Sequence, residues 1–237
     1  MNETFYNWIK ECDNIVFFGG AGVSTESGLP DFRSVDGLYN QKYDFPPETI
    51  LSHTFFMQNP AEFFRFYRDK MLAPDVKPNI THLKLAELEK AGKLRAIVTQ
   101  NIDGLHQMAG SKNVLELHGS VLKNKCMKCK KDYTMHDILS SGDVPKCSCG
   151  GIIKPEVVLY EESLDNYVLQ ESIKFISEAD MLIIGGTSLA VYPAASLINY
   201  YKGNKLVLIN KTQTPADSYA DLVIHSSLGD VFSKFSI

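Results

Sequence analysis

The sequence predicts an α/β protein, in which a doubly wound parallel sheet is accompanied by a smaller domain with a metal site. Three observations predict this class. Short apolar runs recur along the chain, helical patterns separate several of them, and a cluster of four cysteines interrupts the alternation. Alternation of strands and helices is typical of a parallel sheet with helices on both faces.

Six near-continuous apolar runs predict the strands. They lie at residues 14–18, 94–99, 114–117, 181–184, 205–209 and 222–224. Because these runs do not alternate strictly with polar residues, we expect strands that are buried on both faces. Helical patterns lie at residues 79–91, 164–178 and 193–201. The first of these helices would place Leu83, Leu85 and Leu88 on or near one face.

Two stretches depart from this alternation and predict a second domain. Residues 36–75 are rich in aromatic side chains and look helical, and residues 121–154 contain the clustered cysteines. We expect a larger, Rossmann-like domain made of residues 1–35, 76–120 and 155–237. The smaller domain would combine the helical stretch 36–75 with a zinc ribbon at 121–154, and ligands would bind in the cleft between the two.

The charge balance argues against nucleic acid as a partner. The chain has 44% hydrophobic and 22% charged residues, as in an ordinary globular protein, and its net charge is −4. A binder that uses bulk positive charge is therefore not expected, although residues 121–154 carry seven Lys and three Asp. We interpret those lysines as a solvated surface. A zinc-ribbon nucleic-acid-binding module remains the alternative from another class.

Neither a membrane span nor a secretory signal is expected. No apolar run approaches the ~20 residues that cross a bilayer, and residues 1–18 lack the basic start and cleavage site of a signal peptide. We therefore expect a cytoplasmic protein that does not bind membranes. No long heptad pattern demands association, so we also expect a monomer.

The cysteine spacing predicts a structural zinc ion, one per chain. Cys126 and Cys129 are separated by two residues, Cys147 and Cys149 by one, and 17 residues lie between the pairs. Each pair can place two thiolates on one tetrahedron, and four sulfur ligands leave no open position for catalysis. A redox dithiol is the alternative. The fifth cysteine, Cys12, is expected to be a small buried apolar residue.

The stretch GAGVSTESGLPDFR, residues 20–33, begins like a phosphate-binding turn. Gly20 and Gly22 follow the first predicted strand and could let backbone N–H groups approach a pyrophosphate. The usual dinucleotide fingerprint then breaks down, because Thr25 stands where its third glycine would come and no acidic strand end follows about 20 residues later. Pro30 interrupts any long helix after the loop. We therefore predict a phosphate turn with a long additional segment.

Polar residues follow several of the other predicted strands. They are the run TQNIDGLH at 99–106, His118, Gly186 to Leu189, and Asn210. Ligand sites in open α/β sheets lie at the carboxyl ends of strands, so these residues are expected to share one site. A histidine there, titrating near neutral pH, is a natural general base.

These motifs together resemble a known family. The segments GAGVSTESGLPDFR, TQNIDGLHQMAG, ELHG, the four-cysteine insertion, KPEVVLYEE and GTSLAVYPA occur in this order between about residues 14 and 230. In this they are similar to the sirtuins, NAD-dependent protein-lysine deacylases, and in detail to bacterial members with a single catalytic unit. The resemblance implies a deacetylase that uses NAD and acetylated lysine and releases nicotinamide and O-acetyl-ADP-ribose. His118 would be the base that activates a ribose hydroxyl.

The resemblance also implies the binding residues. The cofactor contacts would be Gly20, Ala21, Gly22, Thr25, Phe32, Arg33, Gln100, Asn101, Ile102, Asp103, His118, Gly186, Thr187, Ser188, Asn210 and Asp230. Among these, Phe32 would shield the nicotinamide end, and Ile102 and Asp103 would hold the carboxamide. Val157, Val158, Leu159 and Tyr160 would form the strand to which an acylated peptide adds. The next residue is Glu161, where the family often has glycine.

Acyl preference and reaction type leave alternatives. Relatives that remove succinyl or malonyl groups carry a Tyr-x-x-Arg pair, and this chain offers Tyr67 and Lys70 at a similar place. Lysine lacks the planar fork that grips a carboxylate, so we expect acetyl groups to be preferred over negatively charged ones. The two residues can also be interpreted as helix-packing and surface residues that take no part in acyl selection. A deacylase for other acyl groups, a mono-ADP-ribosyltransferase and a non-catalytic NAD sensor remain the alternatives.

Overall fold

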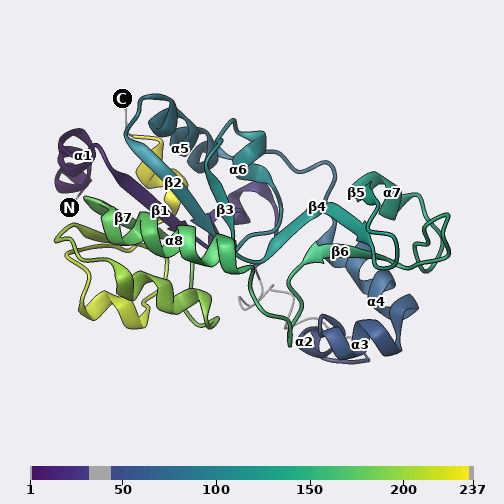
Figure 1. Cartoon of the computed structure of the whole chain (residues 1–237). Helices are drawn as coiled ribbons and strands as arrows, with labels where there is room; N and C mark the ends of the chain where they lie inside the picture. Colours follow the sequence, from purple (N-terminus) through teal and green to yellow (C-terminus); the bar gives the residue numbers. More distant parts are fainter. Residues whose placement is uncertain (1, 32–43, 235–237) are drawn as a thin grey trace.

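The computed structural model describes residues 2–31 and 44–234 and contains the predicted six-stranded parallel sheet (Figure 1). Its strand order is β3-β2-β1-β7-β8-β9, and every neighbouring pair is parallel. The strands are β1 (Ile15–Gly19), β2 (Leu94–Thr99), β3 (Val114–Glu116), β7 (Met181–Gly185), β8 (Leu206–Ile209) and β9 (Leu222–Ile224). All six predicted runs form strands, and the Rossmann-like order confirms the predicted fold class.

Helices cover both faces of this sheet, because successive strand residues point to opposite sides. Phe17 belongs to a core with helices α1 (Asn2–Glu11), α5 (Ile80–Lys90) and α9 (Leu228–Phe232). Its neighbours Val16 and Phe18 belong to the opposite core, with α8 (Asn166–Glu178) and the 3₁₀ segment η5 (Ala194–Tyr200). The sheet is therefore doubly wound, and its central strands are fully buried.

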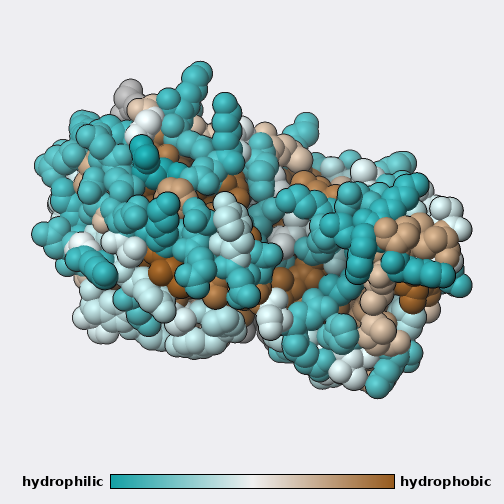
Figure 2. Space-filling view, in the orientation of Figure 1, coloured by the Kyte–Doolittle hydropathy of each residue, from teal (hydrophilic) through white to brown (hydrophobic). Residues whose placement is uncertain are grey.

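A second, antiparallel sheet has the order β5-β4-β6, from β4 (Gly119–Cys126), β5 (Asp132–Thr134) and β6 (Ile153–Val157). The helices α2 (Pro47–Ile50), α3 (His53–Gln58), α4 (Pro60–Phe66) and α7 (Met135–Leu139), with the π-helical turn Tyr67–Met71, complete this part. One apolar core joins the aromatic side chains of α3 and α4 to β4 and β6. Figure 2 shows apolar side chains at the waist between this part and the larger sheet.

Some expectations need correction. Residues 193–201 form a 3₁₀ segment rather than an α-helix. Leu83 is 44% exposed, whereas Leu85 and Leu88 of α5 are buried as expected, together with Thr81 and His82. The predicted domain limits near 120 and 155 fall inside β4 and β6, and the division of the chain at these residues stays a prediction. Cys12 is buried in the first core, as expected.

The remaining elements are short. They are η1 (Ala21–Val23), η2 (Thr25–Ser27), α6 (Leu105–Met108) and η6 (Pro215–Ser218). Within residues 2–31 and 44–234, no helix has the length and apolar character needed to cross a membrane.

Two buried histidines lie between α5 and α6. The ring centroids of His82 and His106 are 4.7 Å apart, and both rings of the pair are essentially inaccessible. Among the residues that the structure describes, the ring nitrogens of His106 have no hydrogen-bond partner. Burial lowers the pKa of His82 to about 4 and that of His106 to about 3. Both imidazoles are therefore neutral in the folded protein at neutral pH.

These histidines predict an acid-sensitive fold. Between pH 6.5 and about 4 the unfolded chain binds protons at these two sites and the folded chain does not, so stability falls as the pH falls through this window. We expect His106→Phe, which places an apolar ring beside Phe17, to reduce the loss of melting temperature over this range. The exposed His136→Ala should leave the loss unchanged. An identical pH dependence for His106→Phe and the parent chain would contradict this interpretation.

Candidate functional site

The candidate site lies at the carboxyl edge of the six-stranded sheet. Gly19 at the end of β1 pairs with Thr99 of β2 and with Gly185 of β7. Gly185 in turn pairs with Ile209 of β8. This register brings the segments after four strands out of the sheet at one edge, as predicted from their polar ends.

The glycine turn is held against the end of β7. The N–H of Gly20 donates to the carbonyl of Gly185 over 3.2 Å, and the N–H of Gly22 donates to that of Gly186 over 2.8 Å. A Cβ on Gly22 would lie 2.8 Å from the Cα of Gly186, so a side chain does not fit there. Gly186 itself has a φ of +60°, which favours glycine. Close backbone packing therefore explains why these positions are glycines.

A hollow of about 610 Å³ opens above this turn. It is lined by eleven of the predicted cofactor residues: Gly20, Ala21, Gly22, Thr25, Gln100, Asn101, His118, Gly186, Thr187, Ser188 and Asn210. Glu26, Ser227 and Leu228 also line it and were not predicted. The Glu26 carboxylate accepts a 2.8 Å hydrogen bond from the N–H of Gly229, which connects the turn to α9. In the sequence, the only signal for Glu26 as a site residue was its position inside the segment at residues 20–33.

A second cavity of about 300 Å³ lies between the two sheets. Its wall includes Ile102 and Asp103, which were predicted to contact the cofactor, and Val157, Val158, Leu159 and Tyr160, which were predicted to contact peptide. Tyr67, Lys70 and Met71 also line it. Ala21, Gln100, Asn101, His118 and Val191 line both the hollow and this cavity. The two spaces therefore meet at these five residues.

His118 is half-buried at this junction, and its ring is oriented by the backbone. Its Nδ1 lies 2.9 Å from the carbonyl oxygen of Gln100. A carbonyl can only accept, so Nδ1 carries the proton and Nε2 keeps its lone pair. Burial lowers the pKa of His118, and the hydrogen bond to Gln100 opposes this effect only in part. The imidazole is therefore neutral at neutral pH and able to accept a proton at Nε2.

The loop after β2 is fixed by a chain of side-chain hydrogen bonds. Ser24 donates to a carboxylate oxygen of Asp103 over 2.6 Å, and Asn101 donates to Ser24 over 3.0 Å. The second oxygen of Asp103 accepts from the N–H of Leu105, at the start of α6. Ser24 was not predicted as a site residue, and its position in the glycine segment was the only sequence signal for it. Its hydroxyl connects that segment to Asp103.

Gln100 and Thr187 form a second link across the edge of the sheet. The Gln100 amide donates to the Thr187 hydroxyl over 3.0 Å, and the N–H of Leu189 donates to the same oxygen over 3.1 Å. The loop after β2 and the loop after β7 therefore hold each other in place.

The stretch after β6 is already paired within the chain. Val158 donates its N–H to the carbonyl of His118, Leu159 to the Glu162 carboxylate, and Tyr160 to the carbonyl of Leu51. The carbonyl of Tyr160 accepts from the N–H of His53. The pairing of a peptide with residues 157–160 stays a prediction. It would use those backbone N–H and C=O groups of the rim that are not already hydrogen-bonded within the chain.

Glu161 occupies a backbone conformation that suits glycine. Its φ is 76°, in the left-handed region that costs a residue with a Cβ of order 1 kcal/mol or more. Its carboxylate accepts hydrogen bonds from the backbone N–H and the hydroxyl of Thr54, at 2.9 and 2.7 Å. The glutamate therefore keeps the turn of a glycine and adds two bonds to helix α3.

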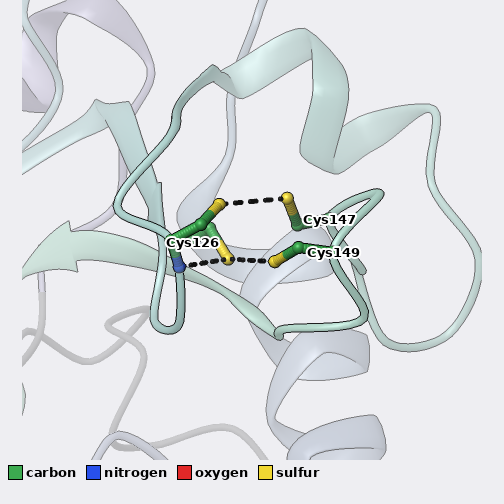
Figure 3. A group of neighbouring side chains, drawn as sticks. Cys126, Cys147 and Cys149 are labelled. Carbon is green, nitrogen blue, oxygen red and sulfur yellow. Dashed lines mark hydrogen bonds between the residues drawn. The ribbon is translucent and has the colours of Figure 1, made fainter.

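The four clustered cysteines form a compact group, as predicted (Figure 3). Their sulfur atoms all lie within 4.8 Å of one another, with Cys126–Cys149 and Cys129–Cys147 separations of 3.5 Å. Tetrahedral Zn–S bonds of about 2.3 Å place sulfur atoms about 3.8 Å apart, so the group fits a zinc ion. The backbone N–H of Cys149 and the hydroxyl of Tyr133 lower the pKa of Cys147 to about 5, which favours its thiolate. None of the four lines the hollow or the cavity.

Three predicted cofactor residues are brought into neither the hollow nor the smaller cavity by the described part of the chain. Phe32 and Arg33 lie outside the described residues. Asp230 is exposed on α9 and lines neither space, although its neighbours Ser227 and Leu228 line the hollow. Its contact with the cofactor stays a prediction.

Comparison with known proteins agrees with this geometry. The model of the Sir2 family matches residues 20–193. The chain belongs to the Sir2 family. An "NAD-dependent protein deacetylase" of Clostridium perfringens (strain 13 / Type A) is 64% identical over 230 residues, which cover 95% of this chain and 94% of the relative.

Solved structures of Sir2 proteins share the whole fold. The "Sir2-p53 peptide-NAD+" complex has 40% identity and a TM-score of 0.88, and the match covers 99% of this chain and 96% of that one. A Sir2 complex with 2'-O-acetyl-ADP-ribose and a deacetylated p53 peptide has 38% identity and a TM-score of 0.86, covering 98% and 96%.

The cysteine group predicts that zinc stabilises the fold. We expect one zinc ion per chain by elemental analysis. A strong chelator should lower the melting temperature, because without the metal the four cysteines no longer cross-link β4 to the loop at 147–149. Cys147→Ser should lose the metal and melt earlier, whereas Cys12→Ala should keep it. Full zinc content in Cys147→Ser would contradict the assignment.

Proposed function

We propose that this chain is an NAD-dependent protein-lysine deacetylase that releases nicotinamide and O-acetyl-ADP-ribose. The observation that carries the proposal is His118, which lines both the larger hollow and the apolar cavity and has an unprotonated Nε2. A base at the junction of two spaces suits a reaction that joins two substrates. The names of the relatives support the same activity.

The larger hollow fits a dinucleotide. Its volume of about 610 Å³ lies in the range of about 300–1,000 Å³ that ligand pockets occupy. Gly20 and Gly22 bring backbone, without side chains, to its wall. We assign the phosphates to the turn at residues 20–25 and to Thr187 and Ser188, and the adenosine ribose to Asn210. When bound, NAD would supply the ribose carbon that bonds to the acyl oxygen of the modified lysine as the bond to nicotinamide breaks.

Asp103 and Ile102 would hold the nicotinamide end. Both line the smaller cavity, next to the junction residues Gln100 and Asn101. The Asp103 carboxylate is oriented by the hydroxyl of Ser24 and the N–H of Leu105, so its position is set before the cofactor arrives. A carboxylate fixed at this place can accept a hydrogen bond from the N–H of a carboxamide. Phe32 and Arg33 would complete this end of the site.

His118 would act as the general base. Its Nδ1–H donates to the carbonyl of Gln100, which leaves Nε2 as the proton acceptor for a ribose hydroxyl. Burial keeps the imidazole neutral at neutral pH, as this role requires. The hydroxyl that loses its proton can then attack the acyl carbon.

The smaller cavity would take the acylated lysine. Its wall combines Ile102, Leu159, Tyr67 and Met71 with the rim at 157–162, so an aliphatic chain would be surrounded by apolar side chains. Tyr67 is fully buried and stacks on Phe63, and Lys70 forms an ion pair with Asp69 at 3.0 Å. These contacts support packing roles for both residues and a preference for acetyl over negatively charged acyl groups. The peptide backbone would lie along the rim.

Removal of the base is the direct test of this function. His118→Ala should reduce NAD-dependent deacetylation of an acetyl-lysine peptide by about 10²–10⁴-fold, the usual contribution of a general base. NAD binding, measured by calorimetry, should remain, because most of the hollow is unchanged. His136→Ala on α7 is the matched control and should keep full activity.

The products separate the rival functions. Free lysine and O-acetyl-ADP-ribose support deacetylation, whereas ADP-ribosylated protein without deacetylation would favour the transferase. NAD binding without turnover in the parent chain would favour a sensor. Full activity in His118→Ala would show that the base assignment is wrong.

A further inference from the structure

The outer rim of the smaller cavity carries two exposed aromatic rings and one carboxylate. Tyr160 and Tyr192 are 40% and 74% exposed, and both line the cavity. Glu161, between the rim residues Tyr160 and Glu162, is also exposed and lines the same cavity. Exposed aromatic faces next to a carboxylate are the surroundings that suit a cationic side chain with an apolar stem.

Glu161 is held at this rim in one position. Its two hydrogen bonds to Thr54 come from neutral donors, so they orient the carboxylate without cancelling its charge. The side-chain hydrogen bond from Thr54 is also the main reason that the pKa of Glu161 lies below its usual value. The carboxylate is therefore ionised at neutral pH. Within residues 2–31 and 44–234, it has no cation within ion-pair distance.

The other charged side chains of the cavity wall are either ion-paired or, in the case of Asp103, held away from the exposed rim. Glu162 pairs with Lys154 at 3.0 Å and with His53 at 2.9 Å. Lys70 pairs with Asp69 at 3.0 Å. Asp103 accepts hydrogen bonds from Ser24 and Leu105 in the interior of the site. Among the described residues of the cavity wall, Glu161 is thus the charged group at the exposed rim that can form an ion pair with a bound peptide.

We propose that Glu161 is a specificity-determining residue that selects acylated peptides with an arginine or lysine beside the modified lysine. The cationic side chain would lie against Tyr160 or Tyr192 and place its charge near the Glu161 carboxylate. The inference rests on the proposed deacetylase function and names the class of substrate for that site. Because Glu161 lines the smaller cavity but not the hollow proposed for the cofactor, the effect belongs to peptide binding and should change KM rather than kcat.

The test uses a panel of acetyl-lysine peptides in which each flanking position is in turn arginine, glutamine or glutamate. At low ionic strength we expect kcat/KM to be about 3- to 10-fold higher for arginine than for glutamine at the position that reaches the rim, as an exposed ion pair with a cation–π contact allows. High salt should reduce this ratio. Glutamate should be the poorest residue there.

Glu161→Gln removes the charge and keeps an oxygen that can accept from Thr54, so the turn is retained. In this variant we expect the arginine preference to fall below about 2-fold. Glu3→Gln on α1 makes the same charge change far from the cavity and should keep the preference.

Equal turnover of all peptides by the parent chain, or a full preference in Glu161→Gln, would overturn this inference and leave the deacetylase function intact. Failure of the parent chain to deacetylate any peptide in the panel with NAD would overturn both.

Discussion

The hydrogen bond from Nδ1 of His118 to the carbonyl oxygen of Gln100 is the interaction on which the site depends. It fixes the ring, assigns the proton to one nitrogen and leaves the other to accept. Both partners are held by backbone contacts. The N–H of Gln100 donates to the carbonyl of Gly19, and the carbonyl of His118 accepts from Val158. The proposed base is therefore connected to β1 on one side and to the rim at residues 157–162 on the other.

The same junction explains why the two sheets meet where they do. Gly119 directly follows His118 and has a φ of +73°, and a Cβ there would lie 1.9 Å from the carbonyl oxygen of Glu156. Only glycine lets β6 approach this closely. The chain thus passes from the parallel sheet through His118 into the antiparallel sheet without a linker. The cysteine group lies in the loops at the far end of β4 and lines neither space, so zinc bound there would stabilise the second sheet rather than take part in the chemistry.

Much of this arrangement could be predicted from the sequence. Buried parallel strands such as β2 and β7 are apolar on both faces, so their runs were evident, and the cysteine spacing predicted a group that the structure confirms. The sequence did not reveal the order β5-β4-β6, because β5 has only three residues and β4 and β6 mix buried with exposed positions rather than forming apolar runs. It also could not reveal Ser24 or the Thr54 contact of Glu161, since both depend on tertiary neighbours 79 and 107 residues away in the chain. The roles of individual cofactor and peptide residues remain predictions that resemblance supplied and geometry supports.

The protonation state of His118 is the most direct test of this account. Nitrogen-15 NMR of histidine-labelled protein, with His118→Ala used to assign the resonances, reports which ring nitrogen carries the proton. At neutral pH we expect a neutral ring protonated at Nδ1, with an unprotonated Nε2 that titrates below the usual histidine pKa because the ring is buried. A ring protonated at Nε2, or an imidazolium at neutral pH, would contradict the account.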